Sequence, residues 1–168
     1  MSKTSILMLM SVYQKVSGHT RVIDNLSIFL AKQGYDVTIG AFKFEKEPPK
    51  NIKRVALTFS NILSNFKKFD ILHNHQTKMN YFSLFTSKPF IFQYHGASTK
   101  LQKINLFLSL LFCQKKIIRL VSVSRSALEQ LPKFARNIPT EVIYNGIDTD
   151  YYNIMSNQKG KKGKPQLF

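Results

Sequence analysis

The chain has 168 residues, of which 25 are Lys or Arg and 9 are Asp or Glu, so its formal net charge at pH 7 is +16. Hydrophobic residues make up 43% of the chain and charged residues 20%, values that exclude a wholly disordered or fibrous protein and predict one folded domain. The single cysteine, Cys113, excludes an internal disulfide framework and a multi-cysteine zinc site and favours a reducing compartment.

The first predicted element is a strand over Ser5 to Val12. Its run SILMLMSV is almost continuously apolar, as expected of a strand buried on both faces of a parallel sheet. The run is short and no small-residue cleavage pattern follows it, so we interpret it as a strand and not as a signal peptide. A helix follows with apolar residues at helical spacing from Val22 to Leu30, and Gly34 is placed to end it with a left-handed cap.

The rest of the chain continues the alternation of strand and helix. The predicted strands span Asp36 to Phe42, Lys53 to Leu57, Phe69 to Asn74, Phe90 to Tyr94, Leu120 to Val123 and Glu141 to Tyr144. The predicted helices span about Ser60 to Lys68, Met79 to Phe85 and Lys100 to Lys116, and a capping box of Ser126 and Glu129 opens one more. Since no tight hairpin signal occurs, we predict an α/β fold: a Rossmann-like open parallel sheet with helices on both faces.

The composition changes after Tyr152 and suggests where the domain ends. Residues 1–152 are expected to form the Rossmann-like domain, residues 153–165 a basic linker rich in Gly and Lys, and residues 166–168 the start of a truncated second domain. The longest apolar run, Ile104 to Cys113, is interrupted by polar residues and is much shorter than the roughly 20 residues that cross a bilayer. No transmembrane helix is therefore expected.

Positive charge is concentrated in the middle of the chain. Residues 48–128 contain 13 Lys and Arg against the single acid Asp70, which predicts an anionic partner. A basic nucleic-acid-binding module is one alternative that this charge supports. No nucleic-acid-binding motif is legible, however, and the apolar residues follow the patterns of buried strands and helices, so we do not expect a nucleic-acid partner.

All four histidines follow predicted strands. His19 lies in the loop after the first strand, His73 and His75 end a later one, and His95 follows the next. Ligands bind beyond the carboxyl ends of the strands in open parallel sheets, so the joint placement predicts a polar cleft, although each histidine alone is also typical of a solvated loop. Zinc is an alternative, because His73 and His75 would point the same way and His95 would supply a third nitrogen, but no carboxylate flanks them to orient the rings.

The loop Val16 to Arg21 joins the first strand to the first helix. Gly18 lets a ligand approach the backbone there, and free amides at the positive end of the helix favour phosphate. A glycine in such a loop is also typical of a simple turn, and the loop lacks a G-x-G-x-x-G fingerprint. Dinucleotide binding is disfavoured, because no acidic residue ends the second strand to hold a ribose.

Five short motifs occur in order along the chain: the Gly-containing loop after the first strand, the strand Phe69 to His75 (FDILHNH), the strand end His95-Gly96, the segment Ser122 to Leu131 (SVSRSALEQL) and the turn VIYNGID. Over about Ser5 to Tyr152 they resemble the N-terminal domain of family 4 glycosyltransferases. One departure is Ser17 before Gly18, where many members carry Gly-Gly. The resemblance implies a GT-B architecture of two Rossmann-like domains facing a cleft, of which this chain provides the N-terminal, acceptor-side half.

The resemblance implies a retaining glycosyltransferase of the hexosyltransferase type, which moves a sugar from a nucleotide-sugar donor to an acceptor hydroxyl without a metal or other cofactor. The family's diphosphate-binding residues lie in the C-terminal domain, which this chain lacks, so the fragment alone is expected to be inactive. The site residues implied by the resemblance are His95 for catalysis, Ser17, Gly18 and Gly96 for the donor, His19, Arg21 and His75 for the acceptor, and Ser124, Asn145, Gly146 and Asp148 at the interdomain cleft.

The basic middle of the chain then points to an anionic, lipid-linked or polysaccharide acceptor. The segment Ile104 to Phe112, flanked by Lys100, Lys103, Lys115, Lys116 and Arg119, resembles a surface helix that rests on anionic lipid headgroups. A buried core helix with solvated lysine ends is the other interpretation. We expect a cytoplasmic protein, peripheral on the inner face of the membrane, and keep a membrane-surface module without catalysis as an alternative.

Overall fold

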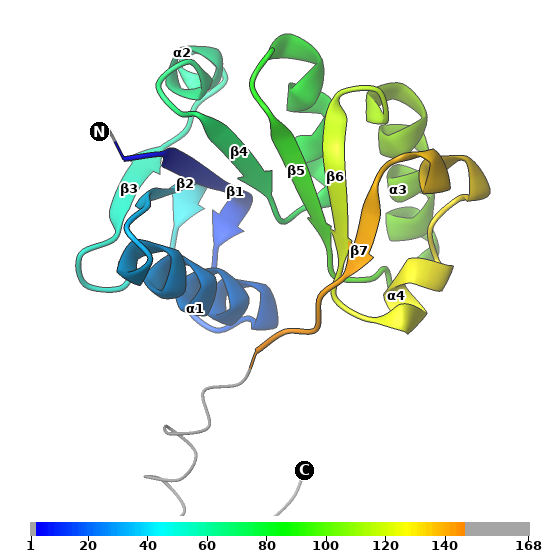
Figure 1. Cartoon of the computed structure of the whole chain (residues 1–168), viewed down its shortest axis with the longest axis horizontal. Helices are drawn as coiled ribbons and strands as arrows, with labels where there is room; N and C mark the ends of the chain where they lie inside the picture. Colours follow the sequence, from blue (N-terminus) through cyan, green and yellow to red (C-terminus); the bar gives the residue numbers. More distant parts are fainter. Residues whose placement is uncertain (1–2, 147–168) are drawn as a thin grey trace, which may run out of the picture.

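A computed structural model describes residues 3–146 and contains one seven-stranded parallel sheet (Figure 1). The strands are β1 (Ser5–Tyr13), β2 (Asp36–Phe44), β3 (Lys53–Ala56), β4 (Ile71–Asn74), β5 (Phe90–Tyr94), β6 (Ile117–Ser122) and β7 (Thr140–Val142). Their order in the sheet is β3-β2-β1-β4-β5-β6-β7. The predicted Rossmann-like fold is confirmed, whereas the predicted linker and second-domain start lie outside the described residues.

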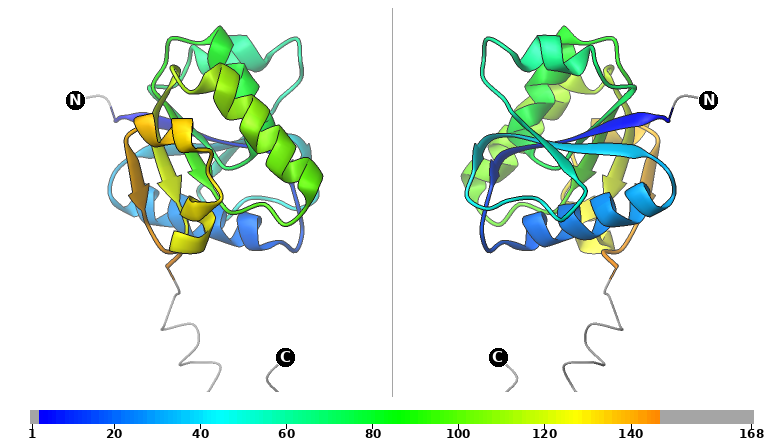
Figure 2. Two further views of the ribbon diagram at one scale, coloured as in Figure 1. Left: turned by 90° about the vertical axis from the view of Figure 1, so that its right-hand side faces the viewer. Right: turned by 90° about the vertical axis from the view of Figure 1, so that its left-hand side faces the viewer.

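Helices cover both faces of the sheet, as predicted (Figure 2). The helical elements are α1 (Gly18–Lys32), α2 (Ile62–Phe66), the 3-10 helix η1 (Thr77–Phe85), α3 (Lys100–Cys113), α4 (Arg125–Glu129) and the 3-10 helix η2 (Lys133–Asn137). On one face, Ile23 of α1 joins a core cluster with residues of β1 and β2. On the other face, Leu106 and Leu110 of α3 pack in a larger cluster that includes Phe90 and Phe92 of β5.

The apolar run of β1 reflects its place near the middle of the sheet. Ile6, Met8 and Met10 belong to the cluster beneath α1, while Leu7 and Leu9 belong to the cluster on the α3 side. Because successive side chains of a strand point to opposite faces, a strand covered on both sides has no polar face. The sequence therefore shows neither alternation nor helical periodicity in this stretch.

Serine and threonine side chains cap the N-termini of the three helices α1, α3 and α4. Ser17 begins α1, and Gly34 follows its end with φ +94°, as predicted for the cap. The capping box predicted for Ser126 is wrong, because Ser124 has the extended backbone of a cap and its hydroxyl accepts a hydrogen bond from the Ala127 amide at 3.0 Å. Ser126 lies inside α4. A true capping box opens α3, between Thr99 and Gln102.

Some element limits differ from the predicted ones. The helix predicted from Met79 is the 3-10 helix η1, which starts two residues earlier because Asn74 donates hydrogen bonds to the Gln76 carbonyl and to the Asn80 side chain and so ties the loop to the strand end. Helix α3 ends at Cys113, and β6 starts at Ile117, three residues before the predicted position. Within residues 3–146, no helix has both the length and the apolar character required to cross a membrane.

Helix α3 is apolar on two sides. Its inner side is buried in the core, whereas its outer face, defined by Leu101, Ile104, Leu108, Leu111 and Phe112, is exposed to solvent. The exposed fraction reaches 78% for Leu101 and 61% for Phe112. Basic residues lie at both ends of the helix: Lys100 and Lys103 in its first turn, and Lys115 and Lys116 just after its last. Arg119, predicted to flank the helix too, lies in β6 and forms an ion pair with Glu141. The two interpretations drawn from the sequence, core helix and surface helix, thus each describe one side of α3.

Candidate functional site

The order in which successive strands are added to the sheet reverses between β1 and β4. These strands are neighbours in the sheet but 65 residues apart in sequence, and the helices that follow them leave on opposite faces. At such a switch point the loops diverge and leave a crevice beyond the carboxyl ends of the strands. Gln76 and Ser11 line this crevice, and the side-chain oxygen of Gln76 accepts a hydrogen bond from the Ser11 amide at 2.7 Å. At the opposite end of the two strands, Asp70 accepts hydrogen bonds from the Ser5 amide and hydroxyl.

The four histidines form one row along this edge of the sheet. The ring of His95 lies edge-on to His19, with centroids 4.5 Å apart. Its Nε2 is 3.4 Å from Nδ1 of His75, and the ring of His75 lies 4.4 Å from that of His73. The predicted clustering of histidines at the strand ends is therefore confirmed, because α1, β4 and β5 bring their carboxyl-terminal loops or first turn to one place.

Burial keeps the inner histidines uncharged at neutral pH. Desolvation lowers the pKa of His73 to about 4, against a smaller opposing effect of a hydrogen bond with Gln93. Desolvation, together with the charges that His19 and His73 would carry, lowers the pKa of His95 to about 3. The same causes hold the pKa of His75 well below its ordinary value. At pH 7 these rings are neutral hydrogen-bonding groups and not cations.

The turn that carries His95 is held from outside by Gln130. Its side-chain oxygen accepts one hydrogen bond from the Tyr94 hydroxyl and one from the Ala97 amide, each at 2.8 Å. These two donors bracket His95 and Gly96, and Gly96 has φ +96°, a backbone conformation that favours glycine. Sequence reasoning did not single out Gln130, although it belongs to the SVSRSALEQL motif.

A cavity of about 240 Å³ opens beside the histidine row. His19, His75 and His95 line it, together with the polar side chains of Gln102 and Asn105 from α3 and with Lys78 as a basic residue. Neutral imidazoles and amides of this kind donate and accept hydrogen bonds without carrying charge, which suits the hydroxyl groups of a carbohydrate.

The family model for Glycosyltransferase Family 4 matches residues 16–151. The chain belongs to this family. Among solved structures it is similar to HepE from Anabaena, crystallised with UDP and glucose, with a TM-score of 0.67 and 14% identity over 96% of this chain and 50% of that chain. It is also similar to a glycosyltransferase from Rickettsia africae, with a TM-score of 0.62 and 16% identity over 99% of this chain and 51% of that chain. No curated protein matches the sequence.

The two glycosyltransferase structures are about twice as long as this chain. The chain spans about half the length of both glycosyltransferases, whose common fold in this region it shares. It also resembles a sucrose-phosphate synthase domain from Thermosynechococcus elongatus, with a TM-score of 0.53 and 12% identity, over 96% of this chain and 98% of that one. The described residues thus form a Rossmann-like domain of the GT-B type.

In this family 4 domain, two of the three predicted donor residues, Ser17 and Gly18, line a second cavity, of about 420 Å³, at the start of α1, whereas Gly96 lines the histidine cavity. Arg21, predicted for the acceptor, lies at this second cavity and not beside His19 and His75. Ser17, Gly18 and Thr20 line the second cavity, with the basic residues Lys15 and Arg21 and with Lys46, which forms an ion pair with Asp24 in the same lining. Thr20 is 1% exposed, and its Oγ1 has no hydrogen-bond partner in the described structure. The Ser17 hydroxyl is used as the cap of α1, and space above Gly18 is open. Amides, a free hydroxyl and positive charge at a helix start favour an anion.

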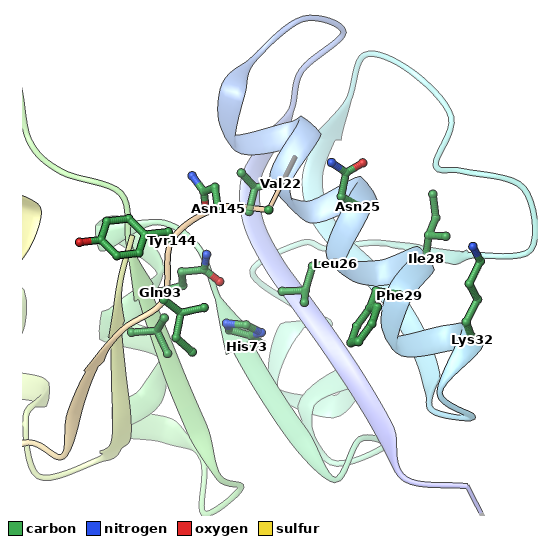
Figure 3. A pocket seen from close by; sticks show the side chains of 13 residues that line it. Val22, Asn25, Leu26, Ile28, Phe29, Lys32, His73, Gln93, Tyr144 and Asn145 are labelled. Atoms are coloured by element: carbon green, nitrogen blue, oxygen red, sulfur yellow. The ribbon is translucent and has the colours of Figure 1, made fainter. Parts of the chain in front are cut away.

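The predicted interdomain residues of the family 4 domain are only partly together. Asn145 and Gly146 line an apolar cavity of about 480 Å³ between α1 and the segment after β7. Figure 3 shows Leu26 and Phe29 of α1 on one side of this cavity and Asn145 on the other, with His73 between them. Ser124 caps α4 and does not line it, and Asp148 lies outside the described residues.

The zinc interpretation finds no site in the part of the chain that the structure describes. Among residues 3–146, no three His, Cys, Asp or Glu side chains are arranged to hold a metal ion. His73 and His75 stack against one another instead, and His73 lines the apolar cavity while His75 lines the histidine cavity.

Proposed function

We propose that this chain is the N-terminal, acceptor-side domain of a retaining glycosyltransferase that moves a sugar, of hexose type, from a nucleotide-sugar donor to an acceptor hydroxyl. The observation that carries the proposal is the row of neutral histidines beside a cavity at the switch point of a family 4 domain. The UDP and glucose named for the Anabaena structure support a nucleotide-sugar donor.

His95 is the proposed catalytic residue. Sugar transfer passes through a transition state with positive charge on the sugar ring, so a cationic imidazole beside it would raise the barrier. Burial keeps the pKa of His95 at about 3, and the neutral ring can hydrogen-bond the sugar without adding like charge. Gly96 allows the donor to approach the backbone, and His19 is proposed to contact the acceptor. His75 was predicted to do so too, but it is 2% exposed and lies behind His95, so we assign it no direct contact.

The leaving nucleotide diphosphate needs positive charge as it departs. We assign this role in part to the cavity at the start of α1, where Lys15 and Arg21 lie beside the Ser17-Gly18 backbone. Arg21 also lies close enough to this cavity to contact a phosphorylated acceptor. The proposed reaction uses no metal or other cofactor, because these side chains and amides supply the charge.

The experiment that tests this function uses the full-length parent, a panel of nucleotide sugars and nucleotide release as the readout. We expect one donor to turn over and His95→Ala to reduce turnover about 100-fold, the usual contribution of one well-placed hydrogen-bonding group. His95→Gln, which keeps a hydrogen-bonding side chain, should retain more activity, and Ser126→Ala on exposed α4 should change nothing. Turnover that is indifferent to His95 would refute the assignment.

The isolated chain is proposed to be inactive, because it corresponds to half of the two-domain structures that it resembles. The purified 168-residue chain, supplied with the donor that its parent uses, should release no nucleotide above background. Sugar transfer by the chain alone would contradict this part of the proposal.

We further propose that the acceptor is anionic and lipid-linked and that the domain sits on the cytoplasmic face of a membrane. The outer face of α3 carries the support: five exposed apolar side chains with lysines at both ends of the helix. A contiguous exposed apolar patch of this kind is rare on monomers and marks an interaction site. Lysines around it select an anionic surface, and each one near such a surface contributes about 1 kcal/mol.

Sedimentation with vesicles tests the membrane proposal. The chain should bind phosphatidylglycerol vesicles and not phosphatidylcholine vesicles, and Leu101→Ser combined with Phe112→Ser should weaken binding strongly. Phe59→Ser is the control, since Phe59 is an aromatic residue outside α3 that is even more exposed, at 83%. Binding to random oligonucleotides with steep salt dependence, but not to vesicles, would instead favour the nucleic-acid alternative.

A further inference from the structure

His75 lies at the centre of the histidine row and is almost fully buried. Its exposed fraction is 2%, and its two ring nitrogens have different surroundings. Nδ1 lies 3.4 Å from Nε2 of His95, within hydrogen-bonding distance, whereas Nε2 is buried without a hydrogen-bond partner among the described residues. A neutral imidazole carries one N–H, so the position of that proton decides which nitrogen is left without a partner.

Two arrangements of the pair are possible, and they differ in cost. If His75 were protonated on Nε2, it would bury an N–H donor with no acceptor while accepting a hydrogen bond from His95 through Nδ1. If it is protonated on Nδ1, the proton is used in the hydrogen bond and only a lone pair remains unmatched at Nε2. Orphaned buried N–H groups are rare in proteins and cost more than an acceptor with an unused lone pair, so the second arrangement is favoured.

We infer that His75 fixes the tautomer of His95: Nδ1–H of His75 donates to Nε2 of His95, which therefore carries its own proton on Nδ1. His95 then presents a donor, and not an acceptor, as its free ring nitrogen beside the 240 Å³ cavity. His75 is a positioning residue in this arrangement, because it acts through His95.

The consequence for catalysis rests on the proposed function. An N–H donor at His95 binds an oxygen of the donor sugar, such as a hydroxyl, without accepting its proton. The hydrogen bond from His75 also holds the ring in one orientation between His19 and His75. Loss of the hydrogen bond would leave both tautomers of His95 accessible, so that only part of the molecules could offer the donor.

Nitrogen NMR of the ¹⁵N-labelled 168-residue chain at pH 7 tests the inference directly. Couplings between the ring protons and the two nitrogens distinguish a protonated nitrogen from a bare one, and the His95 signals are assigned by their loss in His95→Ala. We expect His95 to be protonated on Nδ1 and His75 on Nδ1. Protonation of His95 on Nε2 would overturn the inference, and this wild-type measurement needs no variant that might misfold.

Two variants of His75 test whether it sets the tautomer. In His75→Asn the amide nitrogen takes the place of Nδ1 and keeps the donor, so His95 should remain protonated on Nδ1. In His75→Phe the ring is kept but the donor is lost, so the His95 signals should shift to a mixture of tautomers. His73→Phe is the matched control, which should leave His95 unchanged. An unchanged His95 in His75→Phe would overturn the inference.

Turnover by the full-length parent separates this inference from the proposed function. If both hold, His75→Phe lowers kcat about 10-fold or more with little change in KM, and His75→Asn restores most of it. If the parent transfers no sugar while His95 shows the expected tautomer, the proposed function fails and the inference about the pair stands. If transfer occurs and the two variants behave alike, the positioning role is overturned.

Discussion

The histidine row and the outer face of α3 depart from the usual division of residues in opposite ways. At the row, polar rings that normally reach water are withdrawn from it, and His75 is 2% exposed. On α3, leucine and phenylalanine side chains that normally form a core face solvent, and Leu101 is 78% exposed. Both arrangements cost stability in the isolated domain. The two places at which we propose binding are therefore those where the fold accepts a loss of stability, by burying polar rings at one and by exposing apolar side chains at the other.

Acidification should produce the largest effect, and between pH 7.5 and 5 it acts chiefly on the three inner histidines of the row. Below the unfolded value of 6.5, the unfolded chain takes up protons on His73, His75 and His95 while the folded chain does not. Stability should therefore fall as the pH drops below about 6.5, by up to about 4 kcal/mol per pH unit when all three rings stay neutral in the folded chain. Urea unfolding between pH 7.5 and 5 measures this slope.

Two features of that experiment keep it specific. The loss should begin near pH 6.5, above the range in which carboxylates titrate, and His95→Gln should make the slope shallower because one histidine fewer takes up a proton. A stability that stays flat from pH 7 to pH 5 would show that the row is accessible to protons in the fold.

A pair of leucines in α3 compares the inner and outer sides of one helix. Leu110 is fully buried and Leu111 is 44% exposed. Leu110→Ala should lower the free energy of unfolding by about 2–5 kcal/mol, since it leaves a cavity in the core, whereas Leu111→Ala should change it by less than about 0.5 kcal/mol. Denaturant unfolding of both variants measures the difference. Equal losses would mean that the outer face is covered in solution.

The two hydrogen bonds that Gln130 accepts from the His95 turn should contribute less to the free energy of unfolding than the packing of the core. Gln130→Leu removes the acceptor used by the Tyr94 hydroxyl and the Ala97 amide, and we expect a loss of about 2 kcal/mol in the free energy of unfolding. Gln130→Glu keeps an acceptor oxygen and serves as the control. A loss of similar size in both variants would indicate that packing, and not hydrogen bonding, accounts for the effect.

The smallest predicted effect concerns two glycines of the site. Gly96 has φ +96°, so Gly96→Ala should cost about 1 kcal/mol from backbone strain, although no atom comes closer than 3.9 Å to the added carbon. Gly18 begins a helix and has open space, so Gly18→Ala should be neutral or slightly stabilising. Thermal unfolding of the two variants measures the contrast, and equal shifts would refute the role of backbone strain at Gly96.

The sheet and the clustering of the histidines could both be predicted from the sequence because both depend on parallel-strand topology. Parallel strands bring their carboxyl ends to one edge, so a residue that follows a strand is placed by topology alone, as His95 is. Topology alone does not determine which side chain forms a hydrogen bond with a particular nitrogen atom of the site. Gln130 was missed because it reaches Ala97 across 33 residues of sequence, which no local pattern records.

Local ambiguity explains the other differences. Ser124 and Ser126 both precede the apolar residues of α4, and only the extended backbone at Ser124 decides which one caps the helix. In α3 the apolar residues encircle the helix, so periodicity did not separate the inner side at Leu110 from the outer side at Leu111. Contacts with η1 and η2 make that division in the structure.

The pairing of β1 with β4 has a consequence for how the domain is assembled. Strands β1 to β3 are joined by pairings between consecutive segments, as are β4 to β7, and only the β1–β4 seam closes a loop of 65 residues. Long loops close slowly, so the two halves are expected to form first and to meet at the seam afterwards. The histidine row straddles that seam. Its cavity therefore comes into being in the last step of folding, and a newly made chain has no binding site until its sheet is whole.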